Sequence, residues 1–227
     1  MAQSVLIVGE SGSGKSTSIE NLDPRETFII NVANKPLPFK GWKSKYTLYS
    51  KETPTGNMYY SAKPDDIITC MTYVSTKRPE IKSIVIDDFQ FVSGFEYMEK
   101  ALEKGYDKFT RIAANLSKMA TAPISLREDL FVFFMNHVEV SQDMDGDRKL
   151  KAKTIGKMVD NALTLEGLFS IVLFCKEKKE KEGGVRYLFE TRNNGENTCK
   201  SPKGMFDNSE IPNDLLLVKN AILEYQK

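Results

Sequence analysis

The feature that most constrains this chain is residues 9–17, which read GESGSGKST directly after the apolar run VLIV. The segment matches the pattern G-x-x-x-x-G-K-[ST], known as the P-loop. The match is specific when the motif lies between a strand and the start of a helix, which is where the apolar run places it here. We therefore predict a strand that ends in a phosphate-binding loop, whose ligand is a nucleoside triphosphate with Mg²⁺.

Each residue type in this motif has a chemical reason to be there. Glycines let main-chain N–H groups turn inward into an anion-binding nest, and the following helix adds the partial positive charge of its N-terminus. Lys15 supplies an ammonium for the β- and γ-phosphates and should be exposed when the site is empty, while the Ser16 hydroxyl is placed to ligate Mg²⁺. The residues predicted to hold the nucleotide are Gly9, Glu10, Ser11, Gly12, Ser13, Gly14, Lys15, Ser16 and Thr17. The alternative is a chance match in a Gly/Ser-rich turn.

A second motif, SIVIDD, occupies residues 83–88 and has the form of a Walker B strand, in which apolar residues end in an acid. An Asp at the carboxyl end of a core strand faces the same crevice as the P-loop. We therefore predict that Asp87 holds Mg²⁺ together with Ser16. Asp88 either polarises the attacking water as a general base or caps the helix that follows. The alternative is an ordinary solvated Asp-Asp turn.

A third strand, LFVFFMN, ends at Asn136 and is followed by His137, the only histidine of the chain. In P-loop ATPases that have a strand inserted beside the Walker B strand, a polar residue at this point senses the γ-phosphate. Asn136 is therefore a candidate catalytic residue, together with Lys15, Asp87 and Asp88, and His137 could contact the phosphate or a neighbouring loop. The alternative is that both strand-end groups are satisfied by backbone.

Composition narrows the class of protein. The 227 residues suffice for one large α/β domain. Charged residues make up 28% but the net charge is +1, so any nucleic-acid surface must be local. The longest apolar stretch, residues 130–135, is too short to span a bilayer, and no membrane partner is expected. Three cysteines without a CxxC pair indicate buried thiols in a reducing cytoplasm.

Apolar runs alternate with helical patterns along the chain, which is typical of βαβ units and a mainly parallel sheet. We predict core strands at 4–8, 27–32, 83–86 and 130–136, with a possible short strand at 46–49. We predict helices at 15–21, 64–75, 89–101, 108–120, 154–165 and 213–226. Residues 169–176 and 185–192 are expected to form a β-hairpin with Gly183 and Gly184 at the bend. Residues 139–153, poor in apolar side chains, are expected to be a mobile loop. The absence of repeats or linkers favours one domain over 1–227.

The order of GESGSGKST, IVIDD, FFMNH, a polar loop, TIGKMVDNAL and a hairpin resembles the RecA-like P-loop NTPase core. More narrowly, it resembles the compact phage-encoded, AAA-type P-loop ATPases, some of which act in phage recombination as single-strand annealing or strand-exchange proteins. The resemblance covers about residues 4–192, and the tail YLFETRNNGENTCKSPKGMF adds to it. It implies an α/β fold with flanking helices and a C-terminal β-hairpin, and Mg²⁺-dependent ATP hydrolysis. It also implies single-stranded DNA, recombination or replication proteins and further copies of the chain as partners, in the cytoplasm of a host.

One departure from this resemblance matters. RecA-like ATPases usually place a catalytic glutamate just after the second strand. Here that strand runs into NVANKP, residues 31–36, which contains no acid. Either Asp88 replaces the glutamate or hydrolysis is slow.

Two groups of basic residues are candidates for contacts beyond the nucleotide. Spaced cations without an intervening acid suit a phosphate backbone, and such a loop lies near the DNA axis in the RecA-like core. The candidate DNA contacts are Arg148, Lys149, Lys151, Lys153 and Lys157. The alternative is a solvated loop balanced by the aspartates before it. Candidate fingers that act on a neighbouring subunit's γ-phosphate are Arg192, Lys200 and Lys203, whose alternative is an ordinary surface cation.

Three functions fit these motifs. The first is an ATPase that couples its nucleotide state to DNA binding and assembly. The second is a nucleotide kinase, although the chain has no Arg-rich lid and no arginine-bearing acceptor motif after the Walker B strand. The third is a nucleotide-gated interaction protein with little turnover, which the missing glutamate permits. The lack of an Asn-Lys-x-Asp motif favours ATP over GTP.

Overall fold

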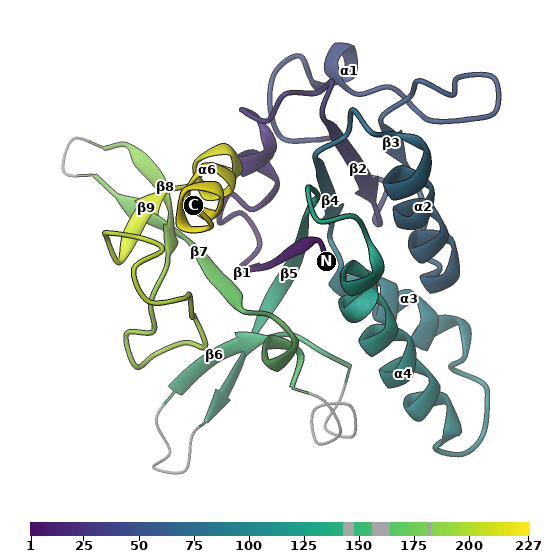
Figure 1. Cartoon of the computed structure of the whole chain (residues 1–227). Helices are drawn as coiled ribbons and strands as arrows, with labels where there is room; N and C mark the ends of the chain where they lie inside the picture. The colour runs from purple at the N-terminus through teal and green to yellow at the C-terminus, as the bar shows by residue number, and fades with distance from the viewer. Residues whose placement is uncertain (143–147, 156–163, 181–182) are drawn as a thin grey trace.

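The computed structural model describes residues 1–142, 148–155, 164–180 and 183–227. Within these residues the chain forms a nine-stranded sheet in the order β3-β2-β4-β5-β1-β7-β8-β9, with β6 paired to β5 outside this path (Figure 1). The strands are β1 (Gln3–Gly9), β2 (Thr27–Asn31), β3 (Met58–Tyr59), β4 (Ser83–Asp87), β5 (Phe131–Gln142), β6 (Arg148–Ala152), β7 (Ile171–Lys179), β8 (Val185–Glu190) and β9 (Glu210–Pro212).

The strands from β3 to β7 in this order pair in parallel, whereas β8, β9 and β6 pair antiparallel. The central strands read as nearly continuous apolar runs because both faces of a parallel sheet are covered. The predicted fold class is confirmed: a mainly parallel α/β sheet with flanking helices and an antiparallel hairpin, β7–β8, near the C-terminal end.

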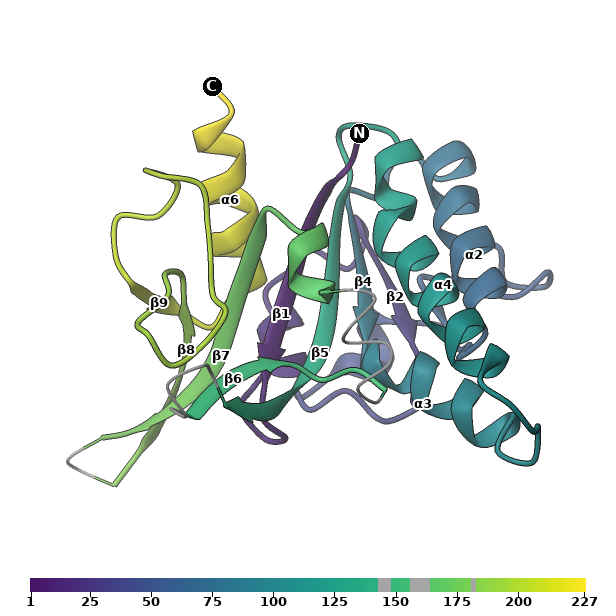
Figure 2. The ribbon, with the colours of Figure 1, turned by 90° about the horizontal axis from the view of Figure 1, so that it is seen from below.

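Two hydrophobic layers cover the two faces of the sheet. Alternate strand residues point to opposite sides, so that Leu6 and Val8 pack in one layer while Val5 and Ile7 pack in the other. The first layer is completed by α2 (Pro64–Lys77), α3 (Gln90–Glu99) and α4 (Asp107–Thr121). The second contains η1 (Ser16–Ile19) and α6 (Leu215–Tyr225). Figure 2 shows α2 and α4 on one side of the sheet and α6 on the other.

The strand β5 determines how the site is assembled. It lies between β1 and β4 and runs parallel to both, so that Val8 is level with Asn136 and Ile86 with Phe134. The carboxyl ends of the P-loop strand and of the Walker B strand therefore meet at one edge of the sheet, and β5 between them continues beyond it. This arrangement agrees with the inserted strand on which the Asn136 and His137 predictions depend.

Several predicted elements need correction. The helix expected at 15–21 is reduced to the short 3₁₀ helix η1. The mobile loop expected at 139–153 was wrong where the chain is described, because Val138–Gln142 pairs antiparallel with Arg148–Ala152. The strand expected at 46–49 is a single bridge at Leu48, preceded by α1 (Trp42–Lys45).

The helix expected at 154–165 falls mostly on residues 156–163, which lie outside the described residues, and η3 (Leu165–Leu168) follows. The short strands β3 and β9 and the 3₁₀ helix η2 (Ala122–Ser125) had no sequence prediction. In the described part of the chain, no helix has the length and apolar character that crossing a membrane requires.

Candidate nucleotide-binding site

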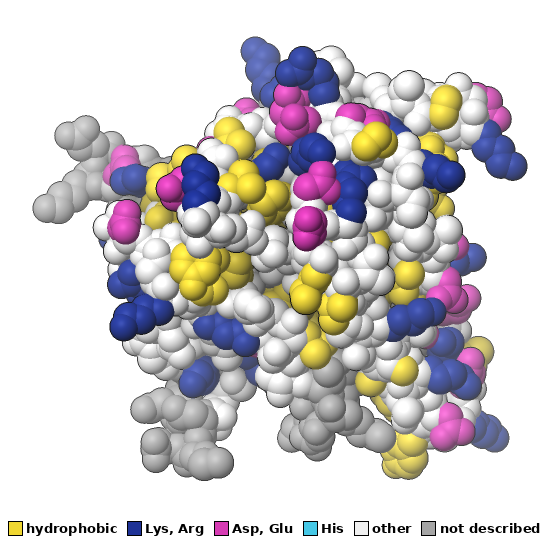
Figure 3. Space-filling model, viewed as in Figure 1, with side chains coloured by type: hydrophobic (Ala, Val, Ile, Leu, Met, Phe, Trp, Pro, Cys, Tyr) yellow, Lys and Arg dark blue, Asp and Glu magenta, His cyan; other side chains and the backbone are white. Residues whose placement is uncertain are grey.

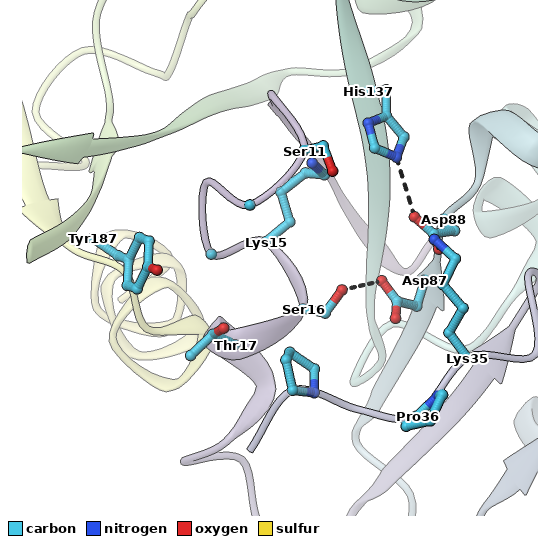
Figure 4. Close-up of a pocket in the computed structure, with 13 residues that line it drawn as sticks. Ser11, Lys15, Ser16, Thr17, Lys35, Pro36, Asp87, Asp88, His137 and Tyr187 are labelled. Carbon is cyan, nitrogen blue, oxygen red and sulfur yellow. Dashed lines mark hydrogen bonds and ion pairs between the residues drawn. The ribbon is translucent and has the colours of Figure 1, made fainter. Parts of the chain in front are cut away.

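A pocket of about 470 Å³ opens at the edge where β1 and β4 end on either side of β5 (Figure 4). Its lining comes from the P-loop, from the connection after β2, from the end of β4, and from residues within β5 and β8. The residues that line it are Ser11, Gly12, Gly14, Lys15, Ser16, Thr17, Lys35, Pro36, Pro38, Asp87, Asp88, His137 and Tyr187. The two predicted motifs, which are far apart in the sequence, therefore share one pocket.

The P-loop is held in shape before any ligand binds. Gly12 and Gly14 have φ angles of 83° and 94°, in the left-handed region that favours glycine. The Ser13 hydroxyl donates to the carbonyl of Glu10 at 2.8 Å. The buried Cys175 thiol, on the neighbouring core strand β7, donates to the carbonyl of Ser13 at 2.8 Å. The loop is thus a preorganised cradle attached to a core strand.

Lys15 lies inside this cradle. Its ammonium donates to the carbonyls of Gly9 and Glu10 at 2.9 and 2.7 Å, and the residue is only 6% exposed. Burial lowers the pKa of Lys15, because the charged form loses hydration that the nearby carboxylates only partly replace. The expectation that Lys15 is exposed in the empty site was therefore wrong. The ammonium is instead bonded to carbonyls of its own loop.

Ser16 and Asp87 meet across the pocket. The Ser16 hydroxyl donates to Oδ1 of Asp87 at 2.7 Å, and Asp87 is 5% exposed. Burial, with a further contribution from the charge of Asp88, raises the pKa of Asp87 to about 6. A hydroxyl and a carboxylate oxygen are the hard donors that Mg²⁺ takes, and a buried carboxylate gains most from a cation. The donor set therefore fits Mg²⁺.

Asp88 has a different environment although it is the next residue. Its φ angle of 62° turns it out of the strand direction. Its carboxylate lies 2.5 Å from the Lys35 ammonium and 3.3 Å from Nε2 of His137. Burial raises the pKa of Asp88, but the hydrogen bonds with His137 and Lys35 outweigh it and the net pKa is lowered. The N-cap of α3 is Phe89, so the Asp88 side chain does not have the capping role.

Of the two polar residues Asn136 and His137 on β5, only one has its side chain in the pocket lining. His137 is among the described lining residues and Asn136 is not. Asn136 is fully buried and donates to the carbonyls of His137 and Lys153 at 2.9 and 3.0 Å. Because side chains alternate across a strand, adjacent residues cannot both face the site. The structure thus does not place Asn136 in the pocket lining. Backbone carbonyls satisfy its Nδ2, as the alternative expected, whereas its buried Oδ1 has no hydrogen-bond partner among the described residues.

A family model for the AAA domain matches residues 1–202. The chain belongs to the AAA-domain family. The match spans the P-loop, β4 and all of the strands that form the pocket, and identifies a P-loop nucleotide-binding protein of the ATPase type. No curated protein matches the chain.

Four residues that line the pocket of this AAA domain escaped the sequence predictions, namely Lys35, Pro36, Pro38 and Tyr187. Lys35, Pro36 and Pro38 belong to the connection after β2, for which no site residue was predicted. Tyr187 comes from β8, and a Cβ at Gly14 would lie 2.8 Å from its ring, so the ring packs directly on the P-loop. No local pattern marks Tyr187, because only the fold of the sheet brings β8 beside the loop. Figure 4 shows it near Thr17, away from Lys35 and Asp88.

The candidate DNA contacts lie on the β5–β6 pair. Lys149 and Lys151 share one face of β6, and Lys151 is paired with Glu139 at 3.0 Å. Lys153 is exposed just after the strand. The side chain of Arg148 and all of Lys157 lie outside the described residues.

The candidate fingers lie in the segment between β8 and β9. Arg192 donates to the carbonyl of Phe206 at 2.6 Å, so its guanidinium is engaged within the chain. Lys200 and Lys203 are exposed. Figure 3 shows basic and acidic side chains interspersed over the helices, whereas Lys and Arg side chains gather over the β8–β9 segment.

The opposite environments of Asp87 and Asp88 predict opposite effects on stability. The pKa of Asp87 is raised, so its stabilising contribution is complete below pH 4 and is lost as the pH rises through about 6. Asp87→Asn should therefore increase the free energy of unfolding at pH 8, by at most about 3 kcal/mol. The pKa of Asp88 is lowered, so its contribution is present above pH 4, and Asp88→Asn should decrease stability at pH 8.

Urea unfolding of the nucleotide-free protein at pH 8 and at pH 5 measures both effects. Asn can keep the left-handed conformation at position 88, which separates the loss of charge from backbone strain. The gain from Asp87→Asn should be smaller at pH 5. Changes of the same sign in both variants at pH 8 would contradict this description of the site.

Proposed function

We propose that this AAA domain is a Mg²⁺-dependent ATPase that binds single-stranded DNA and assembles with further copies of itself. The observation that carries the proposal is the Ser16–Asp87 pair at 2.7 Å, opposite a preformed P-loop in a pocket of about 470 Å³. Oxygen donors of two motifs converge where a triphosphate on the P-loop would present its terminal phosphates.

The residues of the pocket account for the steps of hydrolysis. Ser16 and Asp87 would hold Mg²⁺, which neutralises charge that develops on the phosphoryl oxygens. Lys15 would leave the loop carbonyls for the phosphates. Asp88 accepts a proton from water as the water oxygen bonds to the γ-phosphorus, and the bond to the β–γ bridging oxygen breaks with its electron pair on ADP. Because the pKa of Asp88 is lowered, it is ionised at neutral pH but is a weak base, so slow turnover is expected.

A nucleotide-gated binding protein with little turnover is the second candidate. It is favoured by the contacts that hold the Asp88 carboxylate, since a carboxylate engaged with Lys35 and His137 must be freed before it can activate water. Tight binding of ATP without phosphate release would support it. No feature of the pocket favours a nucleotide kinase.

The β5–β6 pair is the proposed DNA contact. β5 continues past the edge of the sheet where the P-loop lies, and β6 carries Lys149 and Lys151 there. A strand pair that extends directly from the strand between the two nucleotide motifs suits coupling between nucleotide state and DNA. Following the resemblance, we place the protein in phage recombination or replication, in the cytoplasm of a host.

Lys15→Ala should abolish ATP turnover, because the ammonium that contacts the phosphates is lost. Phosphate release with and without single-stranded DNA measures it. The variant should also be slightly less stable, since the carbonyls of Gly9 and Glu10 lose their donor. Lys43→Ala, an exposed lysine on α1, is the matched control. Turnover retained in the Lys15 variant would exclude the assignment.

Simultaneous Arg148→Ala, Lys149→Ala and Lys151→Ala should weaken binding of single-stranded DNA. If each cation contacts one phosphate, the slope of log affinity against log salt should decrease by about 2. A titration at several salt concentrations, with a fluorescent oligonucleotide, gives this slope. Replacing the exposed Lys40, Lys43 and Lys45 makes the same change in charge elsewhere and should leave the slope unchanged. Equal slopes for wild type and the β6 variant would place the DNA contact elsewhere.

Tyr187 lies at the Thr17 end of the pocket, where the nucleoside would extend from the phosphates. We expect Tyr187→Ala to raise KM for ATP by about tenfold through loss of aromatic contact, with a smaller effect on kcat. Tyr187→Phe keeps the ring and should behave as wild type. A similar loss in the Phe variant would show that the hydroxyl, and not the ring, is what matters.

A further inference from the structure

A second lysine faces the phosphate pocket. Lys35 lines it together with Lys15, Asp87 and Asp88, and its side chain is 56% exposed, in contrast to the buried Lys15. It follows β2, in the segment where the resemblance led us to look for a catalytic acid. A cation that lines such a pocket and is more than half exposed is suited to contact a phosphate oxygen.

A buried asparagine holds the backbone of Lys35 in place. Asn31, 1% exposed at the end of β2, donates from Nδ2 to the Lys35 carbonyl at 2.6 Å and accepts from the Lys35 N–H at 3.2 Å. Asn34 has a φ angle of 53°, which turns the chain back at this point. Asn31 is paired in register with Asp87, so the clamp is anchored beside the proposed metal-binding carboxylate. The root of the lysine thus has a set position relative to the site.

The ammonium of Lys35 is engaged by contacts within the chain. It lies 2.5 Å from Oδ2 of Asp88 and 5.0 Å from the ring centroid of Phe91. Asp88 has a second contact, to His137 through its other oxygen at 3.3 Å. When Lys35 leaves, Asp88 therefore keeps one hydrogen-bond partner. Lys35 can therefore move to another anion without leaving the Asp88 carboxylate unpaired.

We propose that Lys35 is a γ-phosphate sensor in cis: Asp88 holds it in the empty site, and the terminal phosphate of a bound triphosphate takes it from Asp88. The exchange uncovers the Asp88 oxygen that then faces water. ADP has no γ-phosphate and leaves the Lys35–Asp88 pair intact. This inference rests on the proposed function, because it requires a triphosphate on the P-loop.

The test compares affinities for a non-hydrolysable ATP analogue and for ADP, both with Mg²⁺, by calorimetry on the full chain. Lys35→Met keeps the length of the side chain without its charge. It should weaken analogue binding about tenfold or more, as expected for a lost charge-assisted hydrogen bond, with less than about a twofold change for ADP. Lys35→Arg should restore most of the difference. Lys40→Met is the matched control, an exposed lysine of the same connection outside the pocket lining.

Combining Lys35→Met with Asp88→Asn shows whether Lys35 contacts the phosphate or only neutralises the charge of Asp88. If Lys35 only balances that carboxylate, Lys35→Met should have no effect in an Asp88→Asn background. We expect it still to weaken the analogue more than ADP there. Equal losses for both nucleotides, or no loss, overturn the sensor while leaving ATP binding by the wild type intact. Failure of the wild type to bind either nucleotide overturns the proposed function and the sensor together.

Discussion

The hydrogen bond from Ser16 to Asp87 is the contact on which the site depends. It joins the start of η1 to the end of β4, two segments separated in the sheet by the whole of β5. It forms because β1 and β4 run parallel to β5 and end at the same edge of the sheet. The sheet order therefore positions the site, because it brings the two oxygen donors to the same edge.

The two adjacent aspartates have different environments because the backbone turns at Asp88. Asp87 continues the strand, is buried and has a pKa raised to about 6, so it is suited to a cation. Asp88 adopts a left-handed conformation that directs its carboxylate to Lys35 and His137, and its pKa is lowered. Neighbouring carboxylates that repel each other are stabilised when their environments push their pKa values apart. The sequence shows two adjacent aspartates, but it does not show that their pKa values shift in opposite directions.

A feature could be predicted from the sequence when the residues that form it are contiguous, and not when the fold brings distant residues together. The P-loop, the Walker B strand and most core elements are written in contiguous patterns, and they were located correctly. The β5–β6 pair was misread because alternating Lys residues on a half-exposed strand have the composition of a loop. Asn136 and His137 could not be separated, since both faces of this sheet are covered and periodicity does not say which one holds the site. Tyr187 reaches the P-loop only through the order of the strands, which no local pattern contains.

The connection after β2 carries the chemistry in which this chain departs from the resemblance. Asn31 occupies the end of the strand and uses its amide on the main chain of Lys35. A cation is thereby fixed beside Asp88 on a segment that contains no acid. The same lysine that keeps Asp88 ionised also makes it a weaker base, so the pocket favours holding a triphosphate over cleaving it quickly. A site built in this way ties the availability of its base to the presence of a terminal phosphate, because removing the lysine from Asp88 requires another anion within its reach.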